Sequence, residues 1–150
     1  MNNSITISPE TIAELIESQY ADMIEVAHTV GVDKAEWKPL EKGRTVLSQL
    51  QECAVRADRM VATLNGNVFT AFATSEENAV YSTFEKAIEG CTKNAANLAA
   101  KLRTLSDDDL LKVVQTPSGE FSLARLMIGT YWNACYHEGQ IYYISSLLAE

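Results

Sequence analysis

Apolar side chains recur every three or four residues along most of the chain, the spacing that places them on one face of an α-helix. The first such segment is preceded by the cap residue Ser8 and closed by Gly31. The second lies between the cap residue Thr45 and Gly66, which is expected to stop it. The first half of the chain is therefore predicted to form two amphipathic helices.

Two further helical segments follow in the second half of the chain. The third is expected from about Glu76 to Leu105, and the fourth from about Ser122 to Leu148. Four helices of roughly 20 to 30 residues predict an all-α fold, an up-down four-helix bundle. A length of 150 residues suits one such domain, spanning residues 1–150.

Two long connections interrupt the helical pattern. One covers residues 32–44, and the other covers residues 106–120. Within the second, residues 110–114 suit either a short strand or a helical turn, and residues 116–119 carry a strong turn signal. Connections of this length favour crossovers rather than tight hairpins, and the second predicts a small irregular insertion before the last helix.

Composition and charge exclude several classes of partner. The formal charge of −8 and the pI of about 4.8 predict an acidic surface that repels phosphate backbones, so nucleic-acid binding is not expected. No apolar run approaches the roughly 20 residues of a membrane-spanning helix, so no membrane partner is expected. The three cysteines, Cys53, Cys91 and Cys135, form no CxxC pair, which is typical of a reduced cytoplasmic protein with packed thiols.

A polar stripe in the last helical segment is the best candidate for a site. Asn133, His137 and Gln140 are spaced four and then three residues apart, which stacks them on one face of a helix. The surrounding segment is apolar and aromatic, and polar groups that are buried there must find partners. Trp132 and Tyr136 lie beside the stripe and are candidates for the lining of a pocket.

His137 and Asn133 also have the spacing of half a metal site on one helix face. A third ligand must come from another helix, and Glu52 in the second segment is the candidate. Cys53, one position further on, competes with it. A thiolate would favour zinc, whereas carboxylate and amide oxygens suit a harder ion. A buried, hydrogen-bonded histidine without a metal is the simpler interpretation of the same residues.

Four segments, taken in order, resemble the DinB-like superfamily of four-helix bundle proteins. The first segment is similar to the family's Trp-x-Pro loop, and the second is similar to the start of its second helix. The third is similar to the turn before its last helix. The fourth is similar to that last helix, whose pattern is roughly HxxxHRGQI. The resemblance covers about residues 8–148. The matching segments are Trp37-Lys38-Pro39, Gly43-Arg44-Thr45-Val46, Pro117-Ser118-Gly119-Glu120-Phe121-Ser122-Leu123 and Asn133-Ala134-Cys135-Tyr136-His137-Glu138-Gly139-Gln140-Ile141.

The resemblance implies a divalent metal ion, with zinc, nickel and manganese as candidates. Family members hold the ion with three histidines, and the resemblance places Glu52, Asn133 and His137 at those positions, with Cys53 as the alternative in the second helix. Members of known activity include thiol S-transferases that use a low-molecular-weight thiol. A metal-dependent thiol S-transferase, or a related hydrolase, acting on a small-molecule substrate is therefore the implied function.

One of the three family histidines is retained, and this supports an alternative. Glu52 could accept a hydrogen bond from His137, with Asn133 bridging the two, in a cluster that holds no metal. The protein would then be a non-catalytic bundle that binds a small ligand or a partner.

The last segment is apolar on most of its sides, which is wider than the stripe that packs a surface helix onto one core. Something must cover the remaining apolar surface, and aromatic-rich patches are typical of interfaces. The long connections are the competing cover. The apolar residues are Leu126, Met127, Ile128, Tyr131, Trp132, Tyr136, Ile141, Tyr142, Tyr143, Ile144, Leu147 and Leu148.

We therefore expect a homodimer. Light scattering behind a sizing column should give a mass of twice the 16.5 kDa of one chain at micromolar concentrations. A mass equal to that of one chain across the concentration range would mean that the connections cover the apolar surface and that the dimer is not formed.

Overall fold

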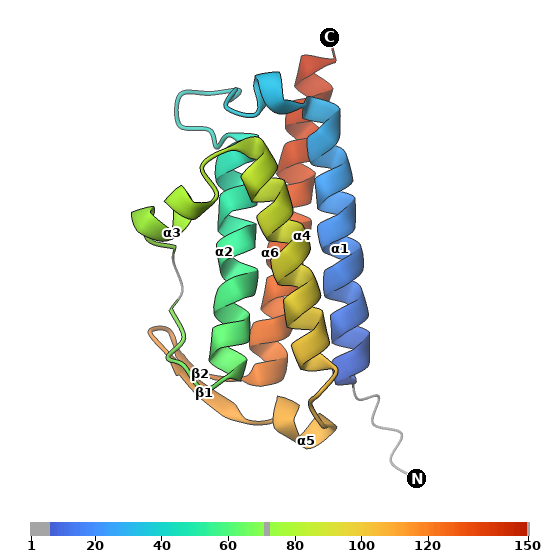
Figure 1. Ribbon diagram of the computed structural model, residues 1–150, viewed down its shortest axis with the longest axis vertical. Helices are drawn as coiled ribbons and strands as arrows, with labels where there is room; N and C mark the ends of the chain where they lie inside the picture. Colours follow the sequence, from blue (N-terminus) through green and yellow to red (C-terminus); the bar gives the residue numbers. More distant parts are fainter. Residues whose placement is uncertain (1–6, 71–72, 150) are drawn as a thin grey trace.

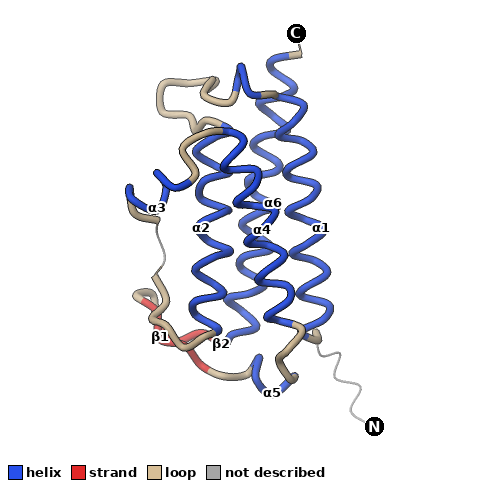
Figure 2. Tube along the Cα trace, in the orientation of Figure 1, coloured by secondary structure: helices blue, strands red, loops and turns tan. Residues whose placement is uncertain are grey.

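The computed structural model describes residues 7–70 and 73–149, and helices dominate them (Figure 1). Within these residues, four long helices lie side by side: α1 (Pro9–Val30), α2 (Val46–Leu64), α4 (Phe84–Leu102) and α6 (Leu123–Leu148). The prediction of a mostly helical chain is confirmed. Shorter elements occupy the connections (Figure 2): η1 (Val32–Lys34), α3 (Ser75–Val80), α5 (Asp107–Leu110), β1 (Val113–Thr116) and β2 (Gly119–Ser122).

The predicted ends of the first two helices are confirmed, because local side-chain hydrogen bonds fix them. The Ser8 hydroxyl accepts from the first turn of α1, and the Thr45 hydroxyl accepts from the first turn of α2. Gly31 ends α1 with a φ of +78°, a conformation that favours glycine. α2 ends at Leu64, two residues before Gly66.

The prediction of one continuous third helix is wrong, because the structure contains two separate helices, α3 and α4, in this region. Tyr81, Ser82 and Thr83 separate the two helices, and the Thr83 hydroxyl caps α4 by accepting from its first turn. The apolar spacing continues across this break, which hid it from the pattern. α4 also ends at Leu102, earlier than expected.

The insertion before the last helix is regular rather than irregular, so that prediction is also corrected. Ser106 and Asp109 form a capping box that starts α5. β1 and β2 then pair as an antiparallel hairpin in which Thr116 faces Gly119 across the turn. The predicted turn signal therefore joins two strands.

The long helices pack in an order that differs from their order in the chain. α1 packs against α6 and α4, whereas α2 packs against α4 and, less extensively, against α6. The connections 32–44 and 103–122 therefore both lead to a helix other than the packed neighbour, as crossovers do. α2 and α4 run in the same direction in Figure 1, which departs from the strict up-down alternation that we predicted.

Apolar side chains from all four long helices form one buried core. Tyr20, Met23, Leu50, Leu98 and Met127 are among its largest fully buried members. Two of the three cysteines are buried and the third is half-buried, and all are unpaired. Among the described helices, none has the length and apolar character needed to cross a membrane.

Buried polar side chains concentrate between α2 and α6. Gln49 on α2 is buried, as are Thr130, Asn133 and His137 on α6. We call this interface between α2 and α6 the polar seam. Burying polar groups costs free energy unless they are hydrogen-bonded, so the polar seam must contain an organised hydrogen-bond network.

Substitution by alanine is expected to change the stability of the protein in opposite directions at two helical glycines, Gly139 and Gly90. A Cβ at Gly139 meets nothing within 4 Å, whereas a Cβ at Gly90 would overlap the ring of Tyr81 and lie 3.2 Å from Cβ of Ala54. Gly139→Ala should stabilise the protein by roughly 0.5–1 kcal/mol, because alanine is the better helix former. Gly90→Ala should destabilise it by about 1–3 kcal/mol through overpacking.

Urea denaturation of the two variants and the wild type measures this difference. Gly90→Ala should also weaken the bond that Asn94 Nδ2 donates to the Tyr81 hydroxyl at 2.8 Å. Equal effects of the two substitutions would contradict the close approach of α2 and Tyr81 to α4.

Candidate functional site

The structure brings together the three residues that the sequence selected. Glu52 lies on α2, and Asn133 and His137 lie one turn apart on α6. Nε2 of His137 lies 3.0 Å from Oε1 of Glu52, and Nδ2 of Asn133 donates to the same oxygen at 3.1 Å. Nδ2 of Asn133 and Nε2 of His137 are 3.4 Å apart. These contacts match the hydrogen-bonded cluster considered above.

Gln49, which was not predicted from the sequence, contacts the other side of the histidine ring. Nδ1 of His137 lies 3.0 Å from Oε1 of Gln49, three residues before Glu52 on α2. His137 is 1 % exposed and Gln49 is equally buried. Both ring nitrogens therefore face oxygen atoms of α2, which fixes the ring plane. One feature of the sequence could have indicated this contact: Gln49 and Glu52 are polar, three residues apart, and lie beside the apolar stripe of α2.

Arg44 completes the cluster at its surface side. Nη1 of Arg44 donates to Oε2 of Glu52 at 2.5 Å, and Nη2 donates to the carbonyl of Ser48 at 2.9 Å. The Glu52 side chain is 37 % exposed, so its carboxylate spans from the buried ring to the surface. Hydrogen bonds from His137, and then from Arg44 and Asn133, hold the pKa of Glu52 well below its usual range, although burial opposes them.

Cys53 does not take the place of Glu52. Its side chain is fully buried, and its thiol donates to Oδ1 of Asn133 at 3.8 Å. Burial raises the pKa of the Cys53 thiol well above its usual range, so the thiolate that binds metals is disfavoured. The helical register therefore directs Glu52, and not Cys53, towards His137.

Arg56 is a second cation on this seam, one turn after Glu52 on α2. Its Nε donates to the Thr130 hydroxyl on α6 at 3.3 Å. Burial lowers the pKa of Arg56 from its usual value. Two arginines, Arg44 and Arg56, thus lie near the Glu52 carboxylate.

The donors present do not fit a divalent ion. Such an ion needs three or more ligand atoms directed at one point. The described residues contain no group of three histidine, cysteine or acidic side chains that could hold one. Asn133 directs its Nδ2 towards Glu52 and His137, and its oxygen towards Cys53. The Arg44 guanidinium already occupies the second oxygen of Glu52.

A cavity of about 590 Å³ opens beside the cluster. Arg44 and Gln49 contribute to its wall, as do the predicted pocket residues Tyr136 and Gln140. Trp132 is not among its lining residues, but it stacks on Tyr136 with ring centroids 5.6 Å apart. The predicted stripe therefore divides: Asn133 and His137 enter the cluster, whereas Gln140 faces the cavity.

No protein-family model matches this chain, and no curated protein matches it either.

The charge of Glu52 should stabilise the fold in a pH-dependent way. Its pKa in the folded protein lies below the value of about 4.3 for an unfolded glutamate, so the stabilisation is fully present above that pH. It is lost as the pH falls from about 4.3 towards the folded-state pKa. We expect Glu52→Gln to destabilise the protein by about 1 kcal/mol at pH 7, and by less at about pH 3.

Denaturant titrations of the wild type and of Glu52→Gln at the two pH values measure how much the substitution lowers the free energy of unfolding at each pH. Glu14→Gln is the matched control, because Glu14 is exposed on α1. Equal losses at both pH values for Glu52→Gln would show that the charge of Glu52 has no part in holding the cluster.

Proposed function

We propose that this chain is a DinB-like four-helix bundle in which an ion-paired, hydrogen-bonded cluster replaces the metal centre, and that it binds a small molecule without metal-dependent catalysis. The packing of four long helices around one core supports the bundle. The order of the matching segments supports the family, because the Trp-x-Pro segment lies between α1 and α2 and the Pro-Ser-Gly segment directly precedes α6.

The observation that supports this proposal most strongly is that both oxygens of the Glu52 carboxylate already accept hydrogen bonds. Oε1 accepts from His137 and Asn133, and Oε2 accepts from Arg44. A metal ion at this position would have to displace Arg44 and turn the Asn133 amide. The ion would thus have to replace three existing hydrogen bonds with a ligand set that retains one histidine.

Two further observations weigh against the family's thiol chemistry in this chain. Thiol activation uses a metal with an open position, which the cluster does not offer. Burial raises the pKa of Cys53 and that of Cys91, the latter to about 12, so neither supplies a thiolate nucleophile in its place. Binding of a small molecule in the neighbouring cavity is therefore the function that the geometry supports best.

The proposed assembly is a homodimer in the cytoplasm. Trp132, Tyr142 and Tyr143 on α6 are each more than 60 % exposed, so the described connections leave these rings uncovered. Exposed aromatic side chains of this kind favour an interface. Three unpaired cysteines are consistent with a reducing compartment.

Elemental analysis tests the central claim. Protein purified without a nickel column and incubated with zinc, nickel and manganese should carry far less than one ion per chain, in the wild type and in His137→Gln alike. A double variant, Asn133→His with Arg44→Leu, provides the positive control, because it restores a second imidazole and removes the competing cation. This variant should gain metal.

The opposite result would identify the metal-dependent enzyme. One ion per wild-type chain that is lost in His137→Gln, together with transfer of a low-molecular-weight thiol to chlorodinitrobenzene, would establish a thiol S-transferase. Metal-dependent hydrolysis without thiol transfer would establish the related hydrolase. Either finding would overturn the proposed function.

A further inference from the structure

The cavity beside the cluster has the size of a small-molecule site. It lies between the α1–α2 connection, the start of α2 and the second half of α6, with a volume of about 590 Å³. Small-molecule pockets occupy roughly 300–1,000 Å³. Tyr136, Tyr143 and Ile144 give it an apolar and aromatic wall on α6, and Pro39 adds to it from the connection.

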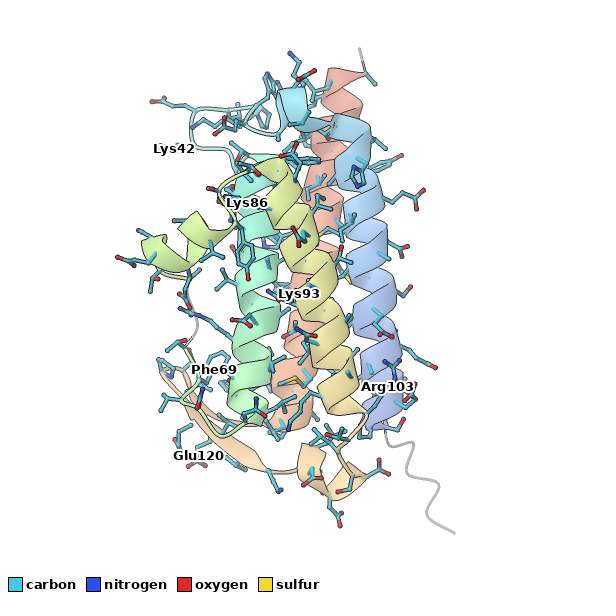
Figure 3. All side chains as sticks on the ribbon, viewed as in Figure 1. Lys42, Phe69, Lys86, Lys93, Arg103 and Glu120 are labelled. Atoms are coloured by element: carbon cyan, nitrogen blue, oxygen red, sulfur yellow. The ribbon has the colours of Figure 1, made fainter. Side chains whose placement is uncertain are left out.

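The opposite side of the cavity is cationic. Lys42 and Arg44 both line it, and its lining residues include no aspartate or glutamate. This is the reverse of the whole chain, which carries a net charge of −8. Figure 3 shows Lys42 on the connection before α2, and within residues 7–70 and 73–149 its ammonium group has no hydrogen bond or ion pair. A local cationic wall of this kind attracts an anion.

Gln140 gives the cavity a third feature. Its Oε1 is fully buried yet has no hydrogen-bond partner among the described residues. A buried acceptor without a donor costs about 1–3 kcal/mol, and a bound molecule that offers a hydroxyl or N–H group recovers this when the Gln140 amide turns towards it. Gln140 belongs to the same stripe as Asn133 and His137 but joins neither of them.

We propose that this cavity binds an amphiphilic organic anion with an aromatic body. The ring system packs against Tyr136 and Tyr143, the anionic group lies against Lys42 and Arg44, and a hydroxyl or N–H donates to Gln140. This inference rests on the proposed function only in taking the cavity as the ligand site. The anionic group is a carboxylate, sulfonate or phosphate, which share the chemistry that lysine and arginine recognise.

Arg44 links the ligand to the cluster, because Glu52 and a bound anion compete for one guanidinium. Nη1 of Arg44 lies 2.5 Å from Oε2 of Glu52. Removing the charge of Glu52 should therefore free Arg44 for the ligand and tighten the binding of an anion. A purely apolar ligand would not respond in this way.

Two fluorescent probes test the proposal with the wild-type protein. Anilinonaphthalene sulfonate carries an aromatic body, an N–H group and an anionic group, and phenylnaphthylamine is its uncharged counterpart. In fluorescence titrations the sulfonate should bind about tenfold more tightly than the amine, a ratio that corresponds to roughly 1.4 kcal/mol.

Substitutions of the cationic wall separate charge from apolar contact. Lys42→Gln should weaken sulfonate binding about fivefold and leave amine binding unchanged. Lys34→Gln is the matched control, since Lys34 is an exposed residue of η1 outside the cavity lining, and should change neither. Glu52→Gln should tighten sulfonate binding about threefold, with no effect on the amine.

A cavity-filling substitution tests the location. Gly139 lines the cavity, and a Cβ there meets no atom within 4 Å, so Gly139→Leu should fill the space and weaken both probes at least about tenfold. Gly139→Ala controls for the change in helix stability and should bind both probes normally. Ala96→Leu controls for the apolar groove between α1 and α4, which Ala96 lines, and should have no effect.

The proposal is overturned if both probes bind equally and Lys42→Gln changes neither, or if Ala96→Leu abolishes binding while Gly139→Leu does not. Metal content has no part in these measurements. A metal found in the wild type would therefore refute the proposed function and leave the cavity result standing, whereas failure of the titrations would leave the metal-free cluster intact.

Discussion

The Glu52 carboxylate is the group on which the polar seam between α2 and α6 depends. Its inner oxygen accepts from His137 and Asn133, and its outer oxygen accepts from Arg44. Without this carboxylate, a buried imidazole and a buried amide would each lose their charged partner. Polar networks in an interior are stabilising only when every member is satisfied. One side chain at the edge of α2 therefore allows α6 to carry polar residues on its core face.

The other long helices also attach to α2 by hydrogen bonds to its backbone. The Tyr20 hydroxyl on α1 donates to the Cys53 carbonyl at 2.9 Å, and Asn94 on α4 donates to the Ala54 carbonyl at the same distance. The Cys91 thiol on α4 lies 3.3 Å from the Leu50 carbonyl. These directional bonds fix the rotation and height of each helix relative to α2, which apolar packing alone specifies less strictly.

Sequence reasoning succeeded where the signal was local. The caps at Ser8 and Thr45 and the stop at Gly31 were predicted because each acts within one helical turn. The break before α4 was missed because the apolar spacing continues from Val80 to Phe84, although Thr83 carried the cap signal that could have revealed it. The ends of α1 and α2 were therefore predicted better than the point at which the expected third helix divides.

The candidate site was predictable only in part for the same reason. Asn133 and His137 share a helix face, so their spacing alone placed them together, whereas the residue pattern left Glu52 and Cys53 as competitors and the family resemblance favoured Glu52. The contact from Arg44 depends on the path of the connection before α2, which no periodicity describes. The Gln49 contact depends on the rotation of α2 relative to α6, which tertiary packing sets.

The packing order of the helices has a consequence for how the chain folds. α1 packs most extensively against α6, so the first and last long helices of the chain meet. Contacts between segments this distant in sequence carry a large loop-closure entropy and slow folding. During synthesis, α1 leaves the ribosome before α4 and α6, the two helices that cover it, and the interface of α2 with α6 that holds His137 closes last. The early folding intermediates of this protein therefore expose the apolar face of α1, which makes them more prone to aggregate than the folded protein.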